Sequence, residues 1–180
     1  MKILVTGSSG FIGKNLISFL KIKYKKKELK IITKNKDVST KIFWANMPKV
    51  DLVIHLASRS NVRESWINPT DYINSNLIGT INVLEYCKLH KAKLILFSSY
   101  LYKGKKIIKS KELDKIYTFN PYALTKKNSE EWCNFYSQNY NLDICILRLF
   151  NIYGKKQKTK FYIPSVISKL KKNQKILINK

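Results

Sequence analysis

The sequence has no apolar run long enough to cross a membrane, which excludes the common class of helical membrane proteins. Residues 1–20 contain only short apolar runs, broken by Gly7, Ser8, Ser9 and Lys14, and this argues against a signal peptide. Apolar residues still make up 44% of the 180 residues, too many for a disordered chain. We therefore expect one globular domain with its own core, in a cytoplasmic protein without membrane contact.

Cysteine is scarce, and its spacing excludes a disulfide scaffold. The three cysteines are Cys87, Cys133 and Cys145, an odd number without any CxxC pair. Each lies among apolar residues, which is typical of reduced thiols in or near the core of a cytoplasmic protein. We expect no metal site.

Acidic residues are few, 11 against 35 lysines and arginines, and the net charge is +24. Such a charge could indicate binding to nucleic acid or to an anionic membrane surface. The lysines are, however, spread along the chain among many isoleucines and asparagines, as an AT-rich genome would produce. Only residues 21–30 form a dense basic patch, where a solvated helix end is expected. We therefore expect no nucleic-acid partner.

Internal repeats and low-complexity linkers are also absent, and apolar segments alternate with helical patterns instead. Strands are predicted at residues 2–6, 29–33, 50–57, 93–99 and 142–150. Helices are predicted after the first strand, at 69–90 and from Pro121 to about Tyr140, and a long polar loop at 102–120. Nearly continuous apolar strands between helices indicate an α/β fold, a Rossmann-type doubly wound parallel sheet with helices on both faces.

Three glycines, Gly7, Gly10 and Gly13, stand directly between the first predicted strand and the first helix. In this setting one glycine permits the tight turn, one lets a pyrophosphate approach the backbone, and one lets helix and strand pack closely. The free N–H groups of the helix start then face the phosphates. The segment predicts a dinucleotide-binding turn.

Tyr122 and Lys126 stand four residues apart, so on a helix they share one face. Asn120 is a good N-cap and Pro121 suits the first helical position. By spacing alone, the simpler interpretation is an aromatic ring packed on an aliphatic lysine stem.

Five motifs in order make the chain similar to the extended short-chain dehydrogenase/reductases, in particular the NAD-dependent sugar epimerase/dehydratase group. They are the glycine turn at 6–13, the "DLVIHLA" strand at 51–57, Asn76 with Gly79 and Thr80, Pro121-Tyr122 with Thr125-Lys126, and Arg148 with Phe150, Asn151, Tyr153 and Gly154.

The resemblance implies NAD as the cofactor, a nucleotide sugar as the substrate, and roles for particular residues. Contacts with the cofactor would come from Gly7, Gly10, Phe11, Ile12, Gly13, Leu56, Ala57, Ser58, Asn76, Ser98, Tyr122, Lys126 and Phe150, and Asn151 would face the sugar nucleotide. A free tyrosine has a pKa near 10, but the ammonium of Lys126 and a positive nicotinamide ring would favour its phenolate. Tyr122 would then take a proton from a sugar hydroxyl while hydride leaves the same carbon.

Two positions in this family pattern stay open. Counting back from Tyr102 selects Ser98 as the catalytic serine, and counting back from Gly104 selects Ser99; we favour Ser98. The second strand lacks the acidic residue that commonly holds the ribose of NAD. Lys34 would instead favour the 2′-phosphate of NADP, and Asp37 would serve NAD if the turn is longer than expected.

The family's substrate lobe extends well beyond a segment like 151–180. We therefore expect residues 1–150 to form the NAD(P)-binding domain and 151–180 to begin a substrate lobe that is truncated here. A homodimer is compatible with this pattern.

The leading hypothesis is an epimerase with Tyr122 as base and Lys126 as its activator. Dehydratase, decarboxylase and reductase activities stay open, although Tyr100 and Leu101 stand where a dehydratase carries an acidic pair. From other classes, the alternatives are an inactive truncated product and a non-catalytic Rossmann module that binds RNA through its lysines.

Overall fold

The computed structural model describes residues 1–25, 28–34, 36–100, 118–159 and 161–176. It divides into two compact units, Met1–Leu149 and Phe150–Lys180. The first unit holds the sheet and most helices, and the second holds helix α7 (Tyr162–Lys171). Most of the polar loop predicted at 102–120 lies outside the described residues.

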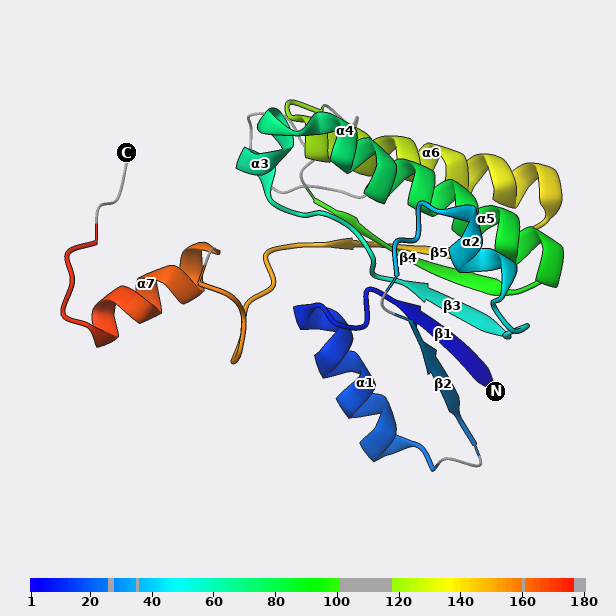
Figure 1. The fold of residues 1–180 in the computed structure, drawn as a ribbon, viewed down its shortest axis with the longest axis horizontal. Helices are drawn as coiled ribbons and strands as arrows, with labels where there is room; N and C mark the ends of the chain where they lie inside the picture. Colours follow the sequence, from blue (N-terminus) through cyan, green and yellow to red (C-terminus); the bar gives the residue numbers. More distant parts are fainter. Residues whose placement is uncertain (26–27, 35, 101–117, 160, 177–180) are drawn as a thin grey trace. The chain divides into compact units, whose positions relative to one another are not determined.

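The first unit is built on five parallel strands in the order β2-β1-β3-β4-β5 (Figure 1). They are β1 (Lys2–Thr6), β2 (Lys30–Thr33), β3 (Leu52–His55), β4 (Lys93–Ser99) and β5 (Ile144–Leu149). The chain runs outward from β1 in one direction to β2 and in the other direction to β3. Ligands of doubly wound sheets bind at the carboxyl ends of the strands beside such a reversal.

Helices cover both faces of the sheet, as Figure 1 shows, and the alternation of side chains along β1 explains why. Ile3 and Val5 pack with residues of α1 (Phe11–Lys23), namely Leu16, Ile17 and Leu20. Leu4 points to the opposite face, in one core cluster with residues of α5 (Gly79–His90) and α6 (Pro121–Tyr140), among them Val83, Leu84, Cys133 and Tyr136. The α/β class predicted from the sequence is confirmed.

The helix predicted at 69–90 has a more varied structure. It begins as α4 (Pro69–Tyr72), continues as the π-helical segment η1 (Ile73–Ile78), and ends as α5. Two short helices, α2 (Lys41–Ala45) and α3 (Val62–Ile67), were not predicted. None of the helices in the described part of the chain combines the length and apolarity that a bilayer crossing requires.

The cysteine prediction is right for two residues and wrong for the third. Cys87 and Cys133 are buried, whereas Cys145 is exposed. Cys145 lies between Ile144 and Ile146, which both pack against the larger core cluster. Because successive side chains of a strand alternate, Cys145 points to the other face of β5.

Helix α5 offers a matched test of this core, because Leu84 is fully buried and Leu89 is 77% exposed. Leu84→Ala should lower the free energy of unfolding by about 2–5 kcal/mol, since it leaves a cavity among core side chains. Leu89→Ala should change it by less than about 0.5 kcal/mol. Urea denaturation of both variants measures the difference, and equal costs would contradict this assignment of the core face.

Candidate active site

The glycine turn lies where β1 ends, and two of its glycines leave no room for a side chain. Gly7 has a φ of +64°, and a Cβ there would lie 2.6 Å from the backbone nitrogen of Ala57. A Cβ at Gly13 would lie 2.5 Å from the carbonyl oxygen of Gly7. The turn therefore packs directly against the chain that leaves β3 and against the first turn of α1.

Gly10 differs, because its surroundings are open. A Cβ at Gly10 would meet only the oxygen of Gly7, at 3.2 Å. Gly10 is also the N-cap of α1, and no side chain caps this helix. The first N–H groups of α1 are thus left for an anion, which fits the pyrophosphate of a dinucleotide in the open space above Gly10. Phe11, Ile12, Leu56, Ala57 and Ser58 are all partly exposed around this turn.

His55, at the end of β3, contacts the end of β1 through Thr6. The hydroxyl of Thr6 accepts a hydrogen bond from the Ala57 N–H at 3.2 Å and lies 2.8 Å from His55 Nδ1. Which of the two atoms donates in this contact depends on the tautomer of the imidazole ring. Nε2 is buried and has no partner among the described residues. Burial, with the nearby charge of Lys126, lowers the pKa of His55 to about 3, so the ring is neutral.

Helix α6 presents Tyr122 and Lys126 from its first two turns. The side-chain oxygen of Asn120 accepts the Ala123 N–H at 2.7 Å, and Pro121 occupies the first turn, as predicted. Tyr122 is 7% exposed and Lys126 only 3%. Both functional groups are therefore held in a largely desolvated environment.

Burial shifts the pKa of both groups. It lowers the pKa of Lys126 to about 8, although Cys133 and Glu130 act in the opposite direction. It also raises the pKa of Tyr122, and a hydrogen bond with Ser99 opposes this. Among the chain's own groups, desolvation outweighs the effects that we expected to favour the phenolate.

The serine beside Tyr122 is Ser99, which shares a side-chain hydrogen bond with the phenol. Ser98 and Ser99 are both buried at the end of β4. Along β4, Leu94 and Leu96 pack in the core cluster with α6, whereas Ile95 and Phe97 pack in the cluster with α1, so Ser98 continues the series that faces α6. The choice between Ser98 and Ser99 as the catalytic serine therefore stays a prediction. The residues used for counting back, Tyr102 and Gly104, lie outside the described part of the chain.

Asn76, in η1, forms hydrogen bonds with two other segments of the chain, and its expected contact with the cofactor stays a prediction. Its side-chain oxygen accepts the Arg59 N–H at 2.8 Å, and its Nδ2 donates to Arg59 O and to Thr125 Oγ1, both at 3.1 Å. Thr125 Oγ1 in turn donates to Tyr122 O at 2.8 Å. Asn76 therefore holds the loop after β3 against the turn of α6 that carries Tyr122.

The buried carboxylate of Glu130 forms an ion pair with the partly buried Arg148, which sequence analysis gave only as part of a motif. Arg148 Nε lies 3.1 Å from both carboxylate oxygens of Glu130, and Nη2 lies 2.7 Å from Oε2. The carboxylate lies one helical turn after Lys126, and together with Cys133 it opposes the effect of desolvation on the pKa of that ammonium. His55 was missed altogether; its one signal was a polar residue that closes a buried apolar strand.

Phe150 and Asn151 belong to the second unit, and Phe150 is exposed. Their expected contacts with cofactor and sugar therefore stay predictions. Lys34 follows β2, and its Nζ lies 3.4 Å from Asn46 O.

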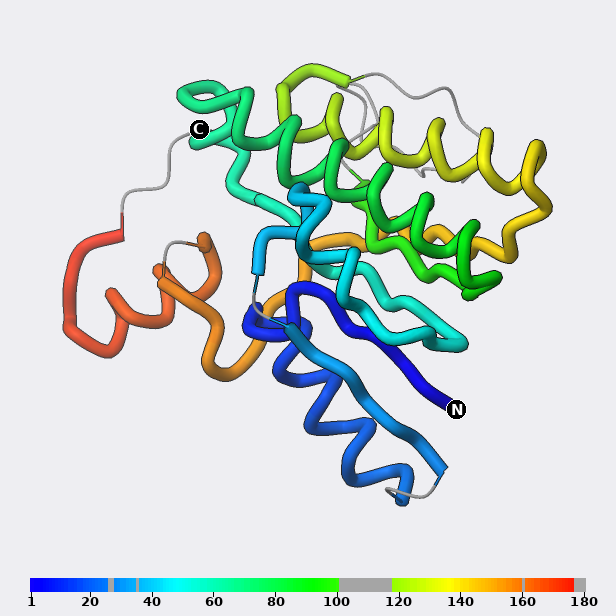
Figure 2. Tube along the Cα trace, turned by 45° about the vertical axis from the view of Figure 1, so that its right-hand side comes forward, coloured from blue at the N-terminus to red at the C-terminus, as the bar shows by residue number. Residues whose placement is uncertain are grey.

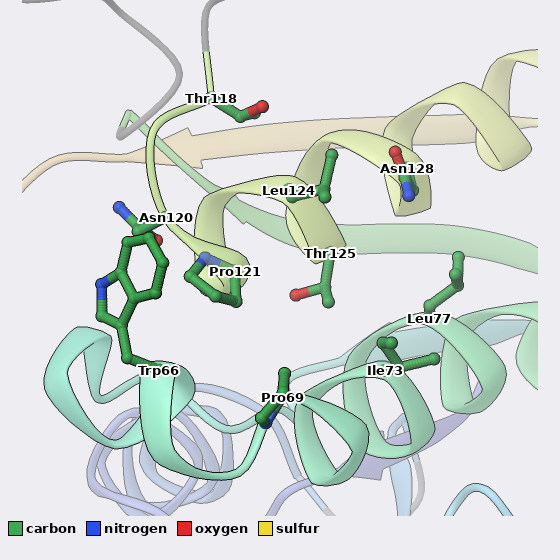
Figure 3. A pocket seen from close by; sticks show the side chains of 10 residues that line it. All are labelled: Trp66, Pro69, Ile73, Leu77, Thr118, Asn120, Pro121, Leu124, Thr125 and Asn128. Atoms are coloured by element: carbon green, nitrogen blue, oxygen red, sulfur yellow. The ribbon is translucent and has the colours of Figure 1, made fainter.

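A cavity of about 440 Å³ opens elsewhere, between α6 and the helices that precede it (Figure 3). Pro69, Ile73 and Leu77 face Pro121 and Leu124 across it. Neither Tyr122 nor Lys126 is among the described residues that line it. Its lining does include Pro121 and Thr125, which flank Tyr122 in α6.

Comparison with known proteins gives one family. A model of the NAD dependent epimerase/dehydratase family matches residues 3–180. A putative UDP-glucose 4-epimerase of Methanocaldococcus jannaschii is 32% identical, over 98% of this chain and 65% of its own length. A dTDP-D-glucose 4,6-dehydratase of Dictyostelium discoideum is 29% identical, over 99% of this chain and 50% of its own length. The chain thus spans about half to two thirds of the length of these relatives.

Solved structures agree. A mutant UDP-glucuronic acid 4-epimerase from Bacillus cereus, in complex with a fluorinated UDP-sugar and NAD, has a TM-score of 0.87 and 27% identity, with 97% of this chain and 64% of that chain covered. RMD from Pseudomonas aeruginosa, complexed with NADPH, has a TM-score of 0.85 and 26% identity, with 98% and 64% covered.

The depressed pKa of Lys126 predicts how stability depends on pH. The amine titrates at about 8 in the folded chain and at its ordinary 10.5 when unfolded. Between these values the unfolded chain binds more protons, so stability should rise with pH, by about 3 kcal/mol in total. Below about pH 8 the folded chain bears the full cost of a buried ammonium.

Lys126→Met should therefore stabilise the chain at pH 7 and remove this rise. Lys127→Met, at a partly exposed position of the same helix where Lys127 pairs with Glu131, should retain it. The measurement is the free energy of unfolding from pH 7 to 10.5, and parallel curves for the wild type and Lys126→Met would contradict the assigned pKa.

Proposed function

Because the chain belongs to the NAD dependent epimerase/dehydratase family, we propose that it acts as an NAD(P)-dependent nucleotide-sugar epimerase with Tyr122 as its general base. The observation that carries the proposal is the placement of Tyr122 and Lys126, buried one helical turn apart, with Ser99 hydrogen-bonded to the phenol. Tyrosine, lysine and serine in this relation suit proton transfer to and from a hydroxyl group.

The dinucleotide would lie on the glycine turn. The N–H groups at the start of α1 would bind the pyrophosphate, and the open space at Gly10 admits it. Leu56, Ala57 and Ser58 would border it where the chain leaves β3. When bound, the nicotinamide ring would supply an acceptor for hydride from a sugar carbon.

Residues of the chain itself would accept and return the proton of the sugar hydroxyl. Tyr122 takes the proton of the sugar hydroxyl, and Ser99 donates a hydrogen bond that stabilises the resulting phenolate. Lys126 keeps its proton below about pH 8 and supports the phenolate electrostatically. The same phenol returns the proton when the carbonyl is reduced again.

Epimerisation is favoured over dehydration by the residue after Ser99. Tyr100 stands where a dehydratase would need an acidic side chain to protonate a leaving hydroxyl. The activity of the whole protein, its nucleotide sugar and its assembly are parts of this proposal.

Gly10→Val tests the dinucleotide site. A branched side chain would fill the open space where the pyrophosphate must approach, so affinity for NAD and NADP should fall at least about tenfold. Gly10→Ala, whose added atom meets only the Gly7 oxygen, should bind with intermediate affinity. Fluorescence titration measures the affinities, and unchanged binding by Gly10→Val would refute the site.

Tyr122→Phe tests the base. Turnover of UDP-, GDP- or dTDP-sugars should fall by roughly 10²–10⁴-fold, because the proton acceptor is gone, while dinucleotide affinity stays nearly unchanged. Tyr72 is a matched control: its ring packs edge-on against Tyr122 at 6.4 Å, and its hydroxyl donates to Asn61 O. Tyr72→Phe should retain most activity. Near-full turnover in Tyr122→Phe would show that another group is the base.

A further inference from the structure

Helix α1 keeps two large apolar side chains out of the core. Leu16, Ile17 and Leu20 pack between the helix and the sheet. Phe19 is 57% exposed and Ile22 is 87% exposed. Figures 1 and 2 show α1 as the one described helix of the first unit on its face of the sheet. The outer side of α1 is therefore not covered by another described helix of that unit.

Exposed lysines surround these two apolar side chains. Lys21, Lys23 and Lys25 lie in or just after the last turn of α1, and all three are exposed. The Nζ of Lys23 lies 5.6 Å from the centre of the Phe19 ring. No carboxylate of the described residues forms an ion pair with any of these lysines. Phe19, Ile22 and the three lysines are called the α1 patch below.

Two further lysines extend the positive charge along the amino edge of the sheet. Lys2 and Lys30 begin β1 and β2, are partners in the parallel register, and are both exposed. Two carboxylates lie at the same edge. Glu28 Oε2 accepts the Lys25 N–H at 3.1 Å, and Asp51 Oδ2 accepts the Lys2 N–H at 2.7 Å. Because both acids bind backbone groups, the lysine charges at this edge are left for an anionic partner.

The chemistry and shape of the α1 patch favour a lipid surface over other anions. Proteins that bind single-stranded nucleic acid combine a positive groove with aromatic rings on which bases stack. The most exposed apolar side chain here is instead the aliphatic Ile22, on the convex surface of a single helix. A fluid lipid surface adapts to such a helix, because apolar side chains enter the headgroup boundary while lysines bind the anionic headgroups.

The α1 patch is also remote from the candidate active site. Helix α1 has 13 residues, so its end lies about 20 Å from the glycine turn at its start. A surface that binds the amino edge of the sheet therefore leaves the carboxyl edge, where a dinucleotide would lie, open to solvent.

We propose that the α1 patch docks this chain on membranes that contain anionic phospholipids. Ile22 and Phe19 would enter the headgroup boundary, and Lys21, Lys23 and Lys25 would bind the headgroup phosphates. The contact is peripheral and needs no spanning segment, so it is compatible with the absence of a long apolar run in the sequence. This inference goes beyond the proposed function and does not depend on it.

The test is co-sedimentation of the 180-residue chain with vesicles of phosphatidylcholine alone or with an equal part of phosphatidylglycerol. The chain should bind only the anionic vesicles, and high salt should weaken binding by screening the charges. Joint replacement of Lys21, Lys23 and Lys25 by Gln should lower the partition coefficient roughly 10²-fold, about fivefold for each lysine. Ile22→Ser, which keeps every charge, should lower it about tenfold.

Two controls match these variants. Joint replacement of Lys36, Lys41 and Lys49 by Gln removes the same charge from exposed positions around α2, on the opposite face of the sheet. Leu89→Ser removes an apolar side chain of α5 that is 77% exposed. Both controls should bind anionic vesicles nearly as the wild type does. Circular dichroism of each variant verifies its fold.

Three outcomes would overturn the inference and leave the proposed function standing. The first is a folded chain that does not bind anionic vesicles at low salt. The second is an equal loss of binding in the two triple-lysine variants, because the effect is then the general charge of the chain. The third is binding of poly(U) RNA that Ile22→Ser leaves unchanged, without vesicle binding, which would assign the α1 patch to nucleic acid.

Discussion

A lysine ammonium buried inside helix α6 is the constraint around which the site is organised. Lys126 is 3% exposed, and such a charge is tolerated only where other groups compensate for its lost hydration. Glu130, one turn further on, provides a negative charge, and Arg148 of β5 fixes that carboxylate through two nitrogens. His55 stays neutral, because its own burial and then the nearby charge of Lys126 lower its pKa to about 3. These groups compensate for only part of the cost, because burial still lowers the pKa of Lys126 to about 8.

A second feature of the site is the set of hydrogen bonds that fix Tyr122. Asn76 connects the loop after β3 to Thr125, and Thr125 connects to the backbone of Tyr122. Ser99 reaches the same phenol from β4. Segments that are distant in sequence therefore hold the backbone of Tyr122 and its phenol, which is the pre-organisation that proton transfer requires. The π-helical geometry of η1 is found where Asn76 must face two partners, as π-bulges often are at functional sites.

Much of this could be predicted from sequence, because strong local signals specify it. The sequence pattern of neighbouring residues is enough to predict the apolar strands between helices. The same holds for the glycine turn and for the helix start at Asn120 and Pro121. One prediction was wrong: Cys145 was placed in or near the core, although its strand exposes one face. The choice between Ser98 and Ser99 stays open, because counting residues along the chain does not decide between them. Helices α2 and α3 are too short to show a clear period. The role of Asn76 depends on contacts across 49 residues, which no local pattern reveals.

The pKa of Tyr122 tests the central claim, that this phenol is the proton acceptor beside a nicotinamide ring. The chain's own groups raise that pKa above its ordinary value near 10. A bound oxidised dinucleotide adds a positive charge, so it should bring the pKa of Tyr122 below 10. The measurement is the ultraviolet difference spectrum of phenolate between the wild type and Tyr122→Phe across a pH titration, with and without saturating dinucleotide. A pKa of Tyr122 that stays above 10 in the saturated complex would contradict its assignment as the base.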